Sequence, residues 1–330
     1  MTAKFKIDSL FNSLSGESVH KEKSVEYDKY REMWVKNPKN FIVGDFPLHL
    51  DIETSAMCNL RCKFCRTTYN RGKYPQMFLD FKLFRKVIDE GIVHGLKAIK
   101  FNWRGEPLLH PELPDMVAYA KDKKLLDVFF NTNLQLLTPE LAERLVKSGL
   151  DRITISAEGY TKELYETNRV GARFEVLKKN INLLLQAREK FGRDNPRIRI
   201  QTVLIPELIG HEKKYIDFWK NRADEVTCLR MKEEVDYNRN QGKIARNWAC
   251  PQLWQRMVVG SDGIVLPCNE DDQCTMVIGN VSSDKISELW TSERLQKLRK
   301  LHEQGESHTI PACNRCPLRA GDIEELKREK

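Results

Sequence analysis

Strand-like and helix-like segments alternate along most of this 330-residue chain, beginning at Leu48. Short apolar runs that predict strands are separated by amphipathic stretches that predict helices, which is the pattern of a parallel α/β sheet. The predicted strands are Leu48–Glu53, Lys97–Asn102, Leu126–Phe130, Arg152–Ser156, Arg197–Leu204 and Glu225–Leu229. Helix start signals stand between them at Asp80, His110-Pro111 and Thr138-Pro139. Six strand–helix units with right-handed connections predict a curved sheet with its active edge at the strand C-termini.

The composition is that of an ordinary globular protein, with 41% hydrophobic and 31% charged residues. No apolar segment approaches membrane-spanning length, and residues 1–16 lack the apolar core of a secretory signal. Nine cysteines without an export signal indicate a reducing compartment, so we expect a cytoplasmic protein whose thiols serve metals rather than disulfides. The formal charge of +8 comes from scattered Lys and Arg residues, so nucleic acid is not an expected partner.

Three of the cysteines, Cys58, Cys62 and Cys65, lie in one short loop directly after the first predicted strand. Their C-x3-C-x2-C spacing supplies three thiolates, one fewer than a tetrahedral zinc site or an all-cysteine [4Fe–4S] cluster requires. Either a fourth ligand comes from elsewhere, or one metal position stays open. An open iron can bind and polarise a small molecule, so the loop favours catalysis, with a zinc loop as the alternative.

The triplet, with Phe64 before its last cysteine, resembles the signature of the radical S-adenosylmethionine (SAM) superfamily. The resemblance implies an open, partial (β/α)6 TIM-like barrel in which the three thiolates hold a [4Fe–4S] cluster and SAM chelates its fourth iron. It also implies an external one-electron donor of the flavodoxin or ferredoxin type. Reductive cleavage of SAM would then give a 5′-deoxyadenosyl radical that abstracts a hydrogen atom from the substrate.

Further motifs stand at the ends of the other predicted strands. Gly105-Glu106-Pro107 follows the second strand and resembles the superfamily segment that receives the amino group of SAM, because glycine allows close approach and a carboxylate suits an ammonium group. By the same resemblance, Ser156 and Arg169 would bind the carboxylate of SAM, with a surface salt bridge as the alternative for Arg169. Glu158 stands where many relatives carry aspartate, which leaves its role open. Three amides on the third and fifth strands would also face the site: Asn131, Asn133 and Gln201.

A second set of cysteines lies near the C-terminus. Cys250 and Cys268 frame a predicted hairpin over residues 256–265 with an Asp262-Gly263 turn, and a predicted helix over Ile286–Leu301 precedes a C-x2-C pair. This pattern resembles the SPASM/twitch extension, which carries auxiliary [4Fe–4S] clusters. The resemblance implies one all-cysteine site, formed by Cys250, Cys268, Cys313 and Cys316. Two full auxiliary clusters beside the first one would need eleven cysteines, so nine favour the single-cluster twitch form. A four-cysteine zinc site is the alternative.

Two cysteines remain, Cys228 at the end of the sixth strand and Cys274 after the hairpin. Each is a candidate catalytic thiol that would return a hydrogen atom to a substrate radical, as related epimerases do with a cysteine. A buried structural residue is the alternative for Cys228, and a cluster ligand is the alternative for Cys274.

The predicted organisation is an N-terminal extension at 1–47 with a helix near Val25–Val35 outside the barrel, the barrel at 48–231, a linker at 232–249 and the auxiliary domain at 250–330. We expect an oxidoreductase or isomerase similar to aminocyclitol dehydrogenases and aminoglycoside epimerases, acting on a small polar substrate such as a sugar. A peptide or protein maturase is the runner-up, because 47 residues are marginal for a separate recognition domain. A zinc-stapled RNA-binding protein is the non-enzymatic alternative.

Overall fold

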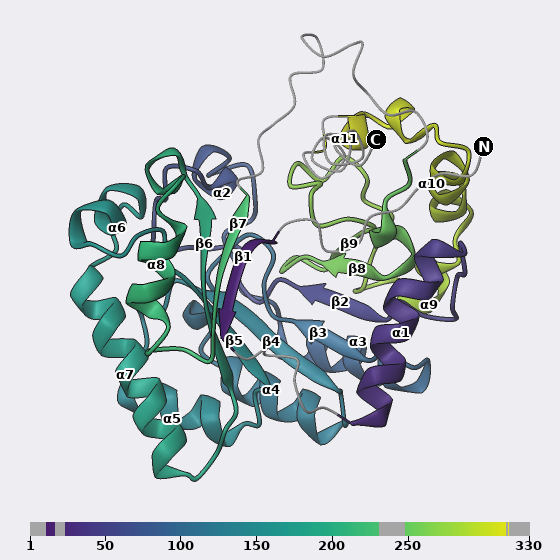
Figure 1. The fold of residues 1–330 in the computed structure, drawn as a ribbon. Helices are drawn as coiled ribbons and strands as arrows, with labels where there is room; N and C mark the ends of the chain where they lie inside the picture. Colours follow the sequence, from purple (N-terminus) through teal and green to yellow (C-terminus); the bar gives the residue numbers. More distant parts are fainter. Residues whose placement is uncertain (1–10, 17–23, 231–247, 315, 317–330) are drawn as a thin grey trace.

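The computed structural model describes residues 11–16, 24–230, 248–314 and 316 (Figure 1). In that part of the chain ten strands form one sheet, in the order β1-β7-β6-β5-β4-β3-β2-β8-β9-β10. The six strands from β2 to β7 are parallel to one another, which confirms the predicted partial α/β barrel. Their bounds are His49–Ile52 (β2), Ala98–Lys100 (β3), Asp127–Thr132 (β4), Arg152–Ser156 (β5), Arg197–Leu204 (β6) and Glu225–Arg230 (β7).

The two faces of these strands differ in chemistry because successive side chains point to opposite sides of a sheet. One face is apolar and belongs to the hydrophobic core beneath the helices, as Leu50 and Ile52 do in β2. The opposite face is polar and is neutralised by ion pairs between neighbouring strands. Arg152 pairs with Asp127 at 2.9 Å, Arg199 with Glu225 at 2.7 Å, and Arg256 with Asp51 at 3.3 Å. The interior of the barrel is therefore polar, and these pairs satisfy most of its charge.

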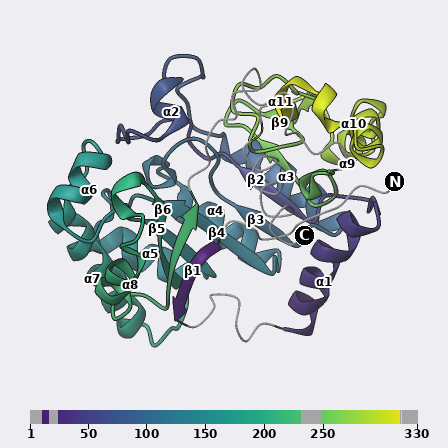
Figure 2. The same cartoon turned by 45° about the horizontal axis from the view of Figure 1, so that its top comes forward.

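Six helices cover the apolar face of the sheet, and Figure 2 shows α4 to α8 along one side of it. Their bounds are Phe81–Val93 (α3), Leu113–Asp122 (α4), Pro139–Lys147 (α5), Lys162–Asn168 (α6), Phe174–Lys190 (α7) and Glu212–Trp219 (α8). The predicted start signals act as N-caps, since Asp80 accepts a hydrogen bond from Leu83 N and Thr138 accepts one from Leu141 N. The helix predicted after His110-Pro111 begins at Leu113.

The N-terminal segment contributes to both ends of the barrel. Phe11–Gly16 forms β1, an edge strand antiparallel to β7 that the sequence did not predict. Val25–Lys39 forms α1, which extends four residues beyond the predicted helix. Its Tyr27, Tyr30 and Trp34 form a separate apolar cluster with Leu48, directly before β2, and Ala98, the first residue of β3. Helix α1 thus packs at the strand N-termini, opposite the predicted active edge.

The C-terminal module continues the barrel sheet. The predicted hairpin is confirmed as β8 (Arg256–Val259) and β9 (Ile264–Leu266), with Gly263 at φ +84°, and β10 (Gly279–Asn280) follows. Strand β8 is parallel to β2, so one sheet runs through both parts of the chain. The predicted linker largely falls at 231–247, outside the described residues. The division into four segments therefore stays a prediction.

The helix predicted over Ile286–Leu301 is interrupted, and this prediction was wrong. It forms α9 (Ile286–Trp290) and α10 (Glu293–Glu303), because Ser292 accepts a hydrogen bond from Leu295 N and caps a new helix. The remaining short helices are α2 (Arg66–Tyr69), α11 (Pro311–Asn314), and the 3₁₀ turns Pro107–Leu109, Pro206–Leu208, Pro251–Trp254 and Ser307–Thr309. Within the described residues, every helix is too short or too polar to cross a bilayer.

Candidate active site

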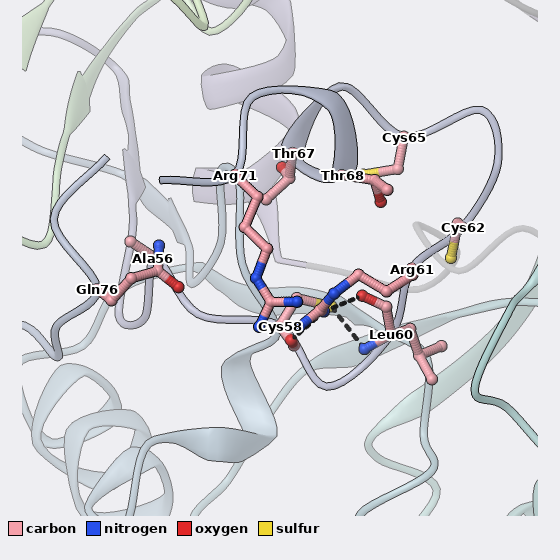
Figure 3. A pocket seen from close by; sticks show the side chains of 10 residues that line it. All are labelled: Ala56, Cys58, Leu60, Arg61, Cys62, Cys65, Thr67, Thr68, Arg71 and Gln76. Atoms are coloured by element: carbon pink, nitrogen blue, oxygen red, sulfur yellow. Dashed lines mark hydrogen bonds between the residues drawn. The ribbon is translucent and has the colours of Figure 1, made fainter. Parts of the chain in front are cut away.

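The first cysteine loop leaves the C-terminal end of β2 and borders an open hollow (Figure 3). Cys58, Cys62 and Cys65 all line this hollow. The loop backbone is fixed from the side by the end of α6 and the residues that follow it. Arg61 N donates to Val170 O at 2.9 Å, and Lys63 N donates to Asn168 O at 3.0 Å. The structure thus brings the three predicted thiols to one cavity at the active edge.

The electrostatics of this loop suit a metal. The pKa of Cys58 is raised to about 11 and that of Cys62 to about 12, mainly by burial and to a lesser extent by neighbouring charges that include other cysteines. Three thiolates close together repel one another unless a cation neutralises them, and metal ligation supplies that cation. Among the described residues, no group of three acidic, His or Cys side chains has the spacing for a single metal ion. The donor set fits an iron–sulfur cluster, although its assignment to these residues stays a prediction.

Gly105 brings the loop after β3 against the start of the cysteine loop. A Cβ at this position would lie 1.9 Å from the Ser55 carbonyl oxygen, so only glycine allows the approach. The next residue fixes the contact, because Glu106 N donates to Met57 O at 2.8 Å. The predicted Gly-Glu-Pro segment therefore lies directly beside the residue that precedes Cys58.

The Glu106 carboxylate is buried and turns toward β4. It accepts hydrogen bonds from Thr132 Oγ1, from Asn133 N at 2.8 Å and from Leu108 N at 3.2 Å. Burial raises the pKa of Glu106, and these bonds partly oppose the increase. In this geometry the carboxylate ties two loops together, so contact of its side chain with the SAM amino group stays a prediction. Asn133 is also structural, since its side chain donates to Asn59 Oδ1 at 2.9 Å.

Arg169 lies in the interior rather than on the surface. Its guanidinium pairs with the Glu158 carboxylate and approaches Cys62, with 3.8 Å between Nη1 and Sγ. It also lies over the Phe64 ring, 5.7 Å from the centroid. Although burial alone would lower it, the Glu158 charge raises the pKa of Arg169. The surface salt bridge considered for Arg169 is therefore wrong, and Glu158, whose role was open, is its buried partner. Ser156 is half-buried at the end of β5, two residues before Glu158.

The second cysteine set converges in the C-terminal module. Cys268 lies close enough to Cys250, Cys313 and Cys316 for their charges to raise its pKa, in addition to the larger effect of burial. His302 connects two of them, because its Nδ1 accepts from Cys250 N at 3.0 Å and its Nε2 lies 3.5 Å from Cys313 Sγ. Cys250 and Cys316 are buried, whereas Cys268 and Cys313 are half-buried. Four thiols that lie near one another form a donor set that fits a fully ligated cluster.

The two remaining cysteines have different surroundings. Cys228 is 0% exposed and lies on the same face of β7 as Val226, in the hydrophobic core and near Tyr215 of α8. Cys228 therefore lies on the helix side of the sheet, because β7 presents the alternate residues to the barrel interior, and its catalytic role stays a prediction. Cys274 is half-buried, and Arg104 Nη1 donates to its sulfur at 3.4 Å.

Glu53 is the residue that sequence reasoning missed. It ends the predicted first strand and is 0% exposed. Its Oε1 and Oε2 accept from Arg104 Nε and Nη2, both at 2.8 Å, and its Oε2 accepts from Ser261 N at 3.1 Å. Arg104 is held further between the rings of Tyr74 and Trp103, at 4.1 and 3.9 Å. The only sequence signal was a carboxylate directly before the cysteine loop, which strand ends commonly carry.

The segment after Cys268 lies across the end of the barrel and joins the two cysteine sets. Trp103 Nε1 donates to Asn269 O at 2.8 Å, and Asn269 Nδ2 donates to Asp51 Oδ2 at 3.2 Å. Beyond it, Arg66 of α2 lies 3.7 Å from Glu270 Oε2. Residues 269–274 thus contact the first strands, the first cysteine loop and Arg104, and we call them the bridging loop.

Comparison with known proteins identifies the class. A model of the radical SAM superfamily matches residues 52–216, half of the chain, and a model of the SPASM iron–sulfur cluster-binding domain matches residues 250–317. The chain therefore belongs to the radical SAM superfamily and carries a C-terminal SPASM domain. Its cofactors are a [4Fe–4S] cluster with SAM and an auxiliary iron–sulfur cluster, so the zinc alternatives are set aside.

The individual relatives are more distant. The tungsten-containing aldehyde ferredoxin oxidoreductase cofactor-modifying protein of Pyrococcus furiosus is 26% identical, over 82% of this chain and 87% of that protein. BtrN in complex with AdoMet and 2-DOIA is 20% identical with a TM-score of 0.57, covering 83% of this chain and 94% of BtrN. Streptococcus suis SuiB bound to the precursor peptide SuiA is 16% identical with a TM-score of 0.62, covering 86% and 75%. The two structures are similar in fold.

Proposed function

We propose that this radical SAM enzyme dehydrogenates a small, polar, hydroxyl-bearing substrate such as a sugar or aminocyclitol. The first cluster would be held by Cys58, Cys62 and Cys65, and the auxiliary one by Cys250, Cys268, Cys313 and Cys316. When bound, SAM and the first cluster would supply a 5′-deoxyadenosyl radical that removes a hydrogen atom, and the auxiliary cluster would supply an acceptor for one electron. A carbinol that loses one hydrogen atom, one electron and one proton becomes a ketone. A flavodoxin or ferredoxin would be the external reductant.

The bridging loop is the observation that carries this proposal. It begins directly after Cys268 and reaches Arg104, beside the Gly-Glu-Pro segment, with 3.4 Å between Arg104 Nη1 and Cys274 Sγ. The proposed site of hydrogen abstraction and the proposed electron acceptor are therefore joined through a few residues. This arrangement suits a reaction in which the substrate radical passes one electron to the second cluster.

The interior of the barrel supports a polar substrate of low charge. The ion pairs near the strand N-termini already use Asp127, Arg152, Arg199 and Glu225. Closer to the active edge, the polar face carries neutral hydrogen-bonding groups, which are half-buried on three neighbouring strands: Asn131, Ser156 and Gln201. Amides and hydroxyls of this kind can both donate to and accept from substrate hydroxyl groups.

The position of Cys228 favours dehydrogenation over epimerisation. An epimerase of this class needs a thiol that reaches the substrate radical, and Cys228 lies in the core instead. Cys274 is the remaining candidate near the barrel mouth, and its sulfur is oriented toward Arg104. The epimerase reading therefore depends on Cys274 alone.

A peptide maturase is the competing function, supported by the fold similarity to SuiB bound to its precursor peptide. Two observations favour the small substrate. The described parts of the N-terminal 47 residues pack against the barrel as β1 and α1 rather than as a separate recognition domain. The match to BtrN, crystallised with 2-DOIA, also covers 94% of BtrN.

The test is an anaerobic assay of the reconstituted full chain with SAM, dithionite and a panel of sugars, aminocyclitols and short peptides. We expect release of 5′-deoxyadenosine that depends on a hydroxylated small molecule, and a ketone product two hydrogens lighter. Turnover in heavy water distinguishes the outcomes, since an epimerase would place solvent deuterium on the carbinol carbon and Cys274→Ala would abolish that label. Peptide-dependent release alone would contradict the proposal.

A further inference from the structure

His302 is a buried histidine that links two proposed ligands of the auxiliary cluster. It lies in the last turn of α10 and is 0% exposed. Its ring is next to Trp248, with 6.1 Å between the centroids. The same helix is fixed to the module by Arg299, whose Nε donates to Leu253 O at 3.0 Å and whose Nη1 donates to Trp290 O at 2.8 Å. The ring therefore has a defined position beside the cysteines.

The hydrogen bonds of His302 determine its tautomer. The backbone N–H of Cys250 can only donate, and it lies 3.0 Å from Nδ1, so Nδ1 is the acceptor. The proton of the neutral ring is then on Nε2. That nitrogen lies 3.5 Å from Cys313 Sγ, within the range of an N–H···S hydrogen bond. His302 is thus oriented to donate to the Cys313 sulfur.

We propose that His302 sets the reduction potential of the auxiliary cluster by donating this hydrogen bond to Cys313. The inference rests on the proposed function, in which Cys250 and Cys313 are cluster ligands. A donor to a ligand sulfur stabilises the more negative, reduced cluster, and hydrogen bonds to the sulfurs are among the factors that tune such potentials. The result is a cluster that accepts the electron from a substrate radical more readily. His302 is a positioning residue, since its ring acts through the ligand.

The test uses the full chain with Cys58, Cys62 and Cys65 replaced by Ala, so that only the auxiliary cluster is loaded. Its midpoint potential is measured by redox titration followed by electron paramagnetic resonance. We expect His302→Phe to lower the equilibrium constant for reduction about tenfold, which corresponds to ~59 mV for one electron. His211→Phe is the matched control, because that ring contacts Tyr160 on the barrel side and should leave the potential unchanged.

Two conservative variants separate tuning from folding. Asn at position 302 can replace Nδ1 as the acceptor for Cys250 N, whereas Gln can replace Nε2 as the donor to Cys313. We expect the potential to stay near the wild-type value in His302→Gln and to fall in His302→Asn. Equal potentials in the Gln and Asn variants would overturn the inference. If the Phe variant loses its iron, the comparison of the Gln and Asn variants is the deciding test. If the chain with only Cys58, Cys62 and Cys65 replaced binds no iron, the proposed ligands of the auxiliary cluster are wrong, and both proposals fail with them.

Discussion

Replacing Gly105 by alanine should disrupt the contact that positions the cysteine loop. The new methyl group would lie 1.9 Å from Ser55 O and 2.5 Å from Met57 O, and both are backbone atoms that no rotamer change can move. A carbon needs about 3.3 Å from such an oxygen, so the loops must separate by roughly 1.4 Å. That movement breaks the 2.8 Å bond from Glu106 N to Met57 O. A buried unpaired group costs ~1–3 kcal/mol and overpacking another ~1–3 kcal/mol, about 2–6 kcal/mol in total.

Calorimetry of the anaerobic, cluster-loaded Gly105→Ala variant measures the effect. At ~2–4 °C per kcal/mol, the melting temperature should fall by roughly 4–24 °C. The dissociation constant for SAM should rise at least ~10-fold, because displacement by about 1 Å has large effects on positioned groups. Gly44→Ala is the control, since its methyl group would meet only Phe46 O at an ordinary 3.7 Å. A Gly105→Ala variant with the wild-type melting temperature and SAM affinity would refute the reasoning.

Three further perturbations test the other buried groups. Glu158→Gln leaves the buried Arg169 charge without its partner, so the free energy of unfolding should fall by about 3–5 kcal/mol, seen as a lower melting temperature; an unchanged value would mean that the pair is not formed. Burial alone would raise the pKa of Asp51, but Arg256 holds it below its usual range. The ionised Asp51 carboxylate therefore stabilises the fold above pH ~4, and this stabilisation is lost on acidification. Between pH 5 and 3, the melting temperature of Asp51→Asn should fall less steeply than that of the wild type. Cys228→Ala should lower stability by about 1 kcal/mol and leave the product unchanged, whereas loss of turnover would restore a catalytic role.

The parallel sheet and the metal loops could be predicted from the sequence because both leave local patterns. Apolar runs bounded by caps such as Asp80 and Thr138 define the strands and helices, and each cap is observed. The cysteine spacings define the two metal sets, which the structure gathers at separate points. The Asp262-Gly263 turn likewise defines the hairpin through its backbone preference.

The remaining features depend on contacts between distant segments. Whether Cys228 faces the interior or the helices depends on the pleat of β7, and a shift of one residue reverses the answer. Strand β1 is stabilised by pairing with β7, more than two hundred residues away, and its own sequence is not strand-like. Glu53 likewise finds its partners, Arg104 and Ser261, in two other parts of the chain. Spacing within one segment carries no information about such partners.

The bridging loop and helix α2 together cover the strand ends where the substrate is proposed to bind. Helix α2 continues the first cysteine loop, and the bridging loop continues the hairpin from Cys268; the two meet where Asn70 Nδ2 donates to Asp272 Oδ2 at 3.0 Å. Because Asn269 is also bonded to Trp103 and Asp51, this contact covers the strand ends from one side. This coverage supports our proposal of a small substrate, because a peptide lying along the same strand ends would compete with these hydrogen bonds. The same bonds tie the segment that follows Cys268, a proposed ligand of the electron acceptor, to the strand ends, and this proximity is what our proposed dehydrogenation requires.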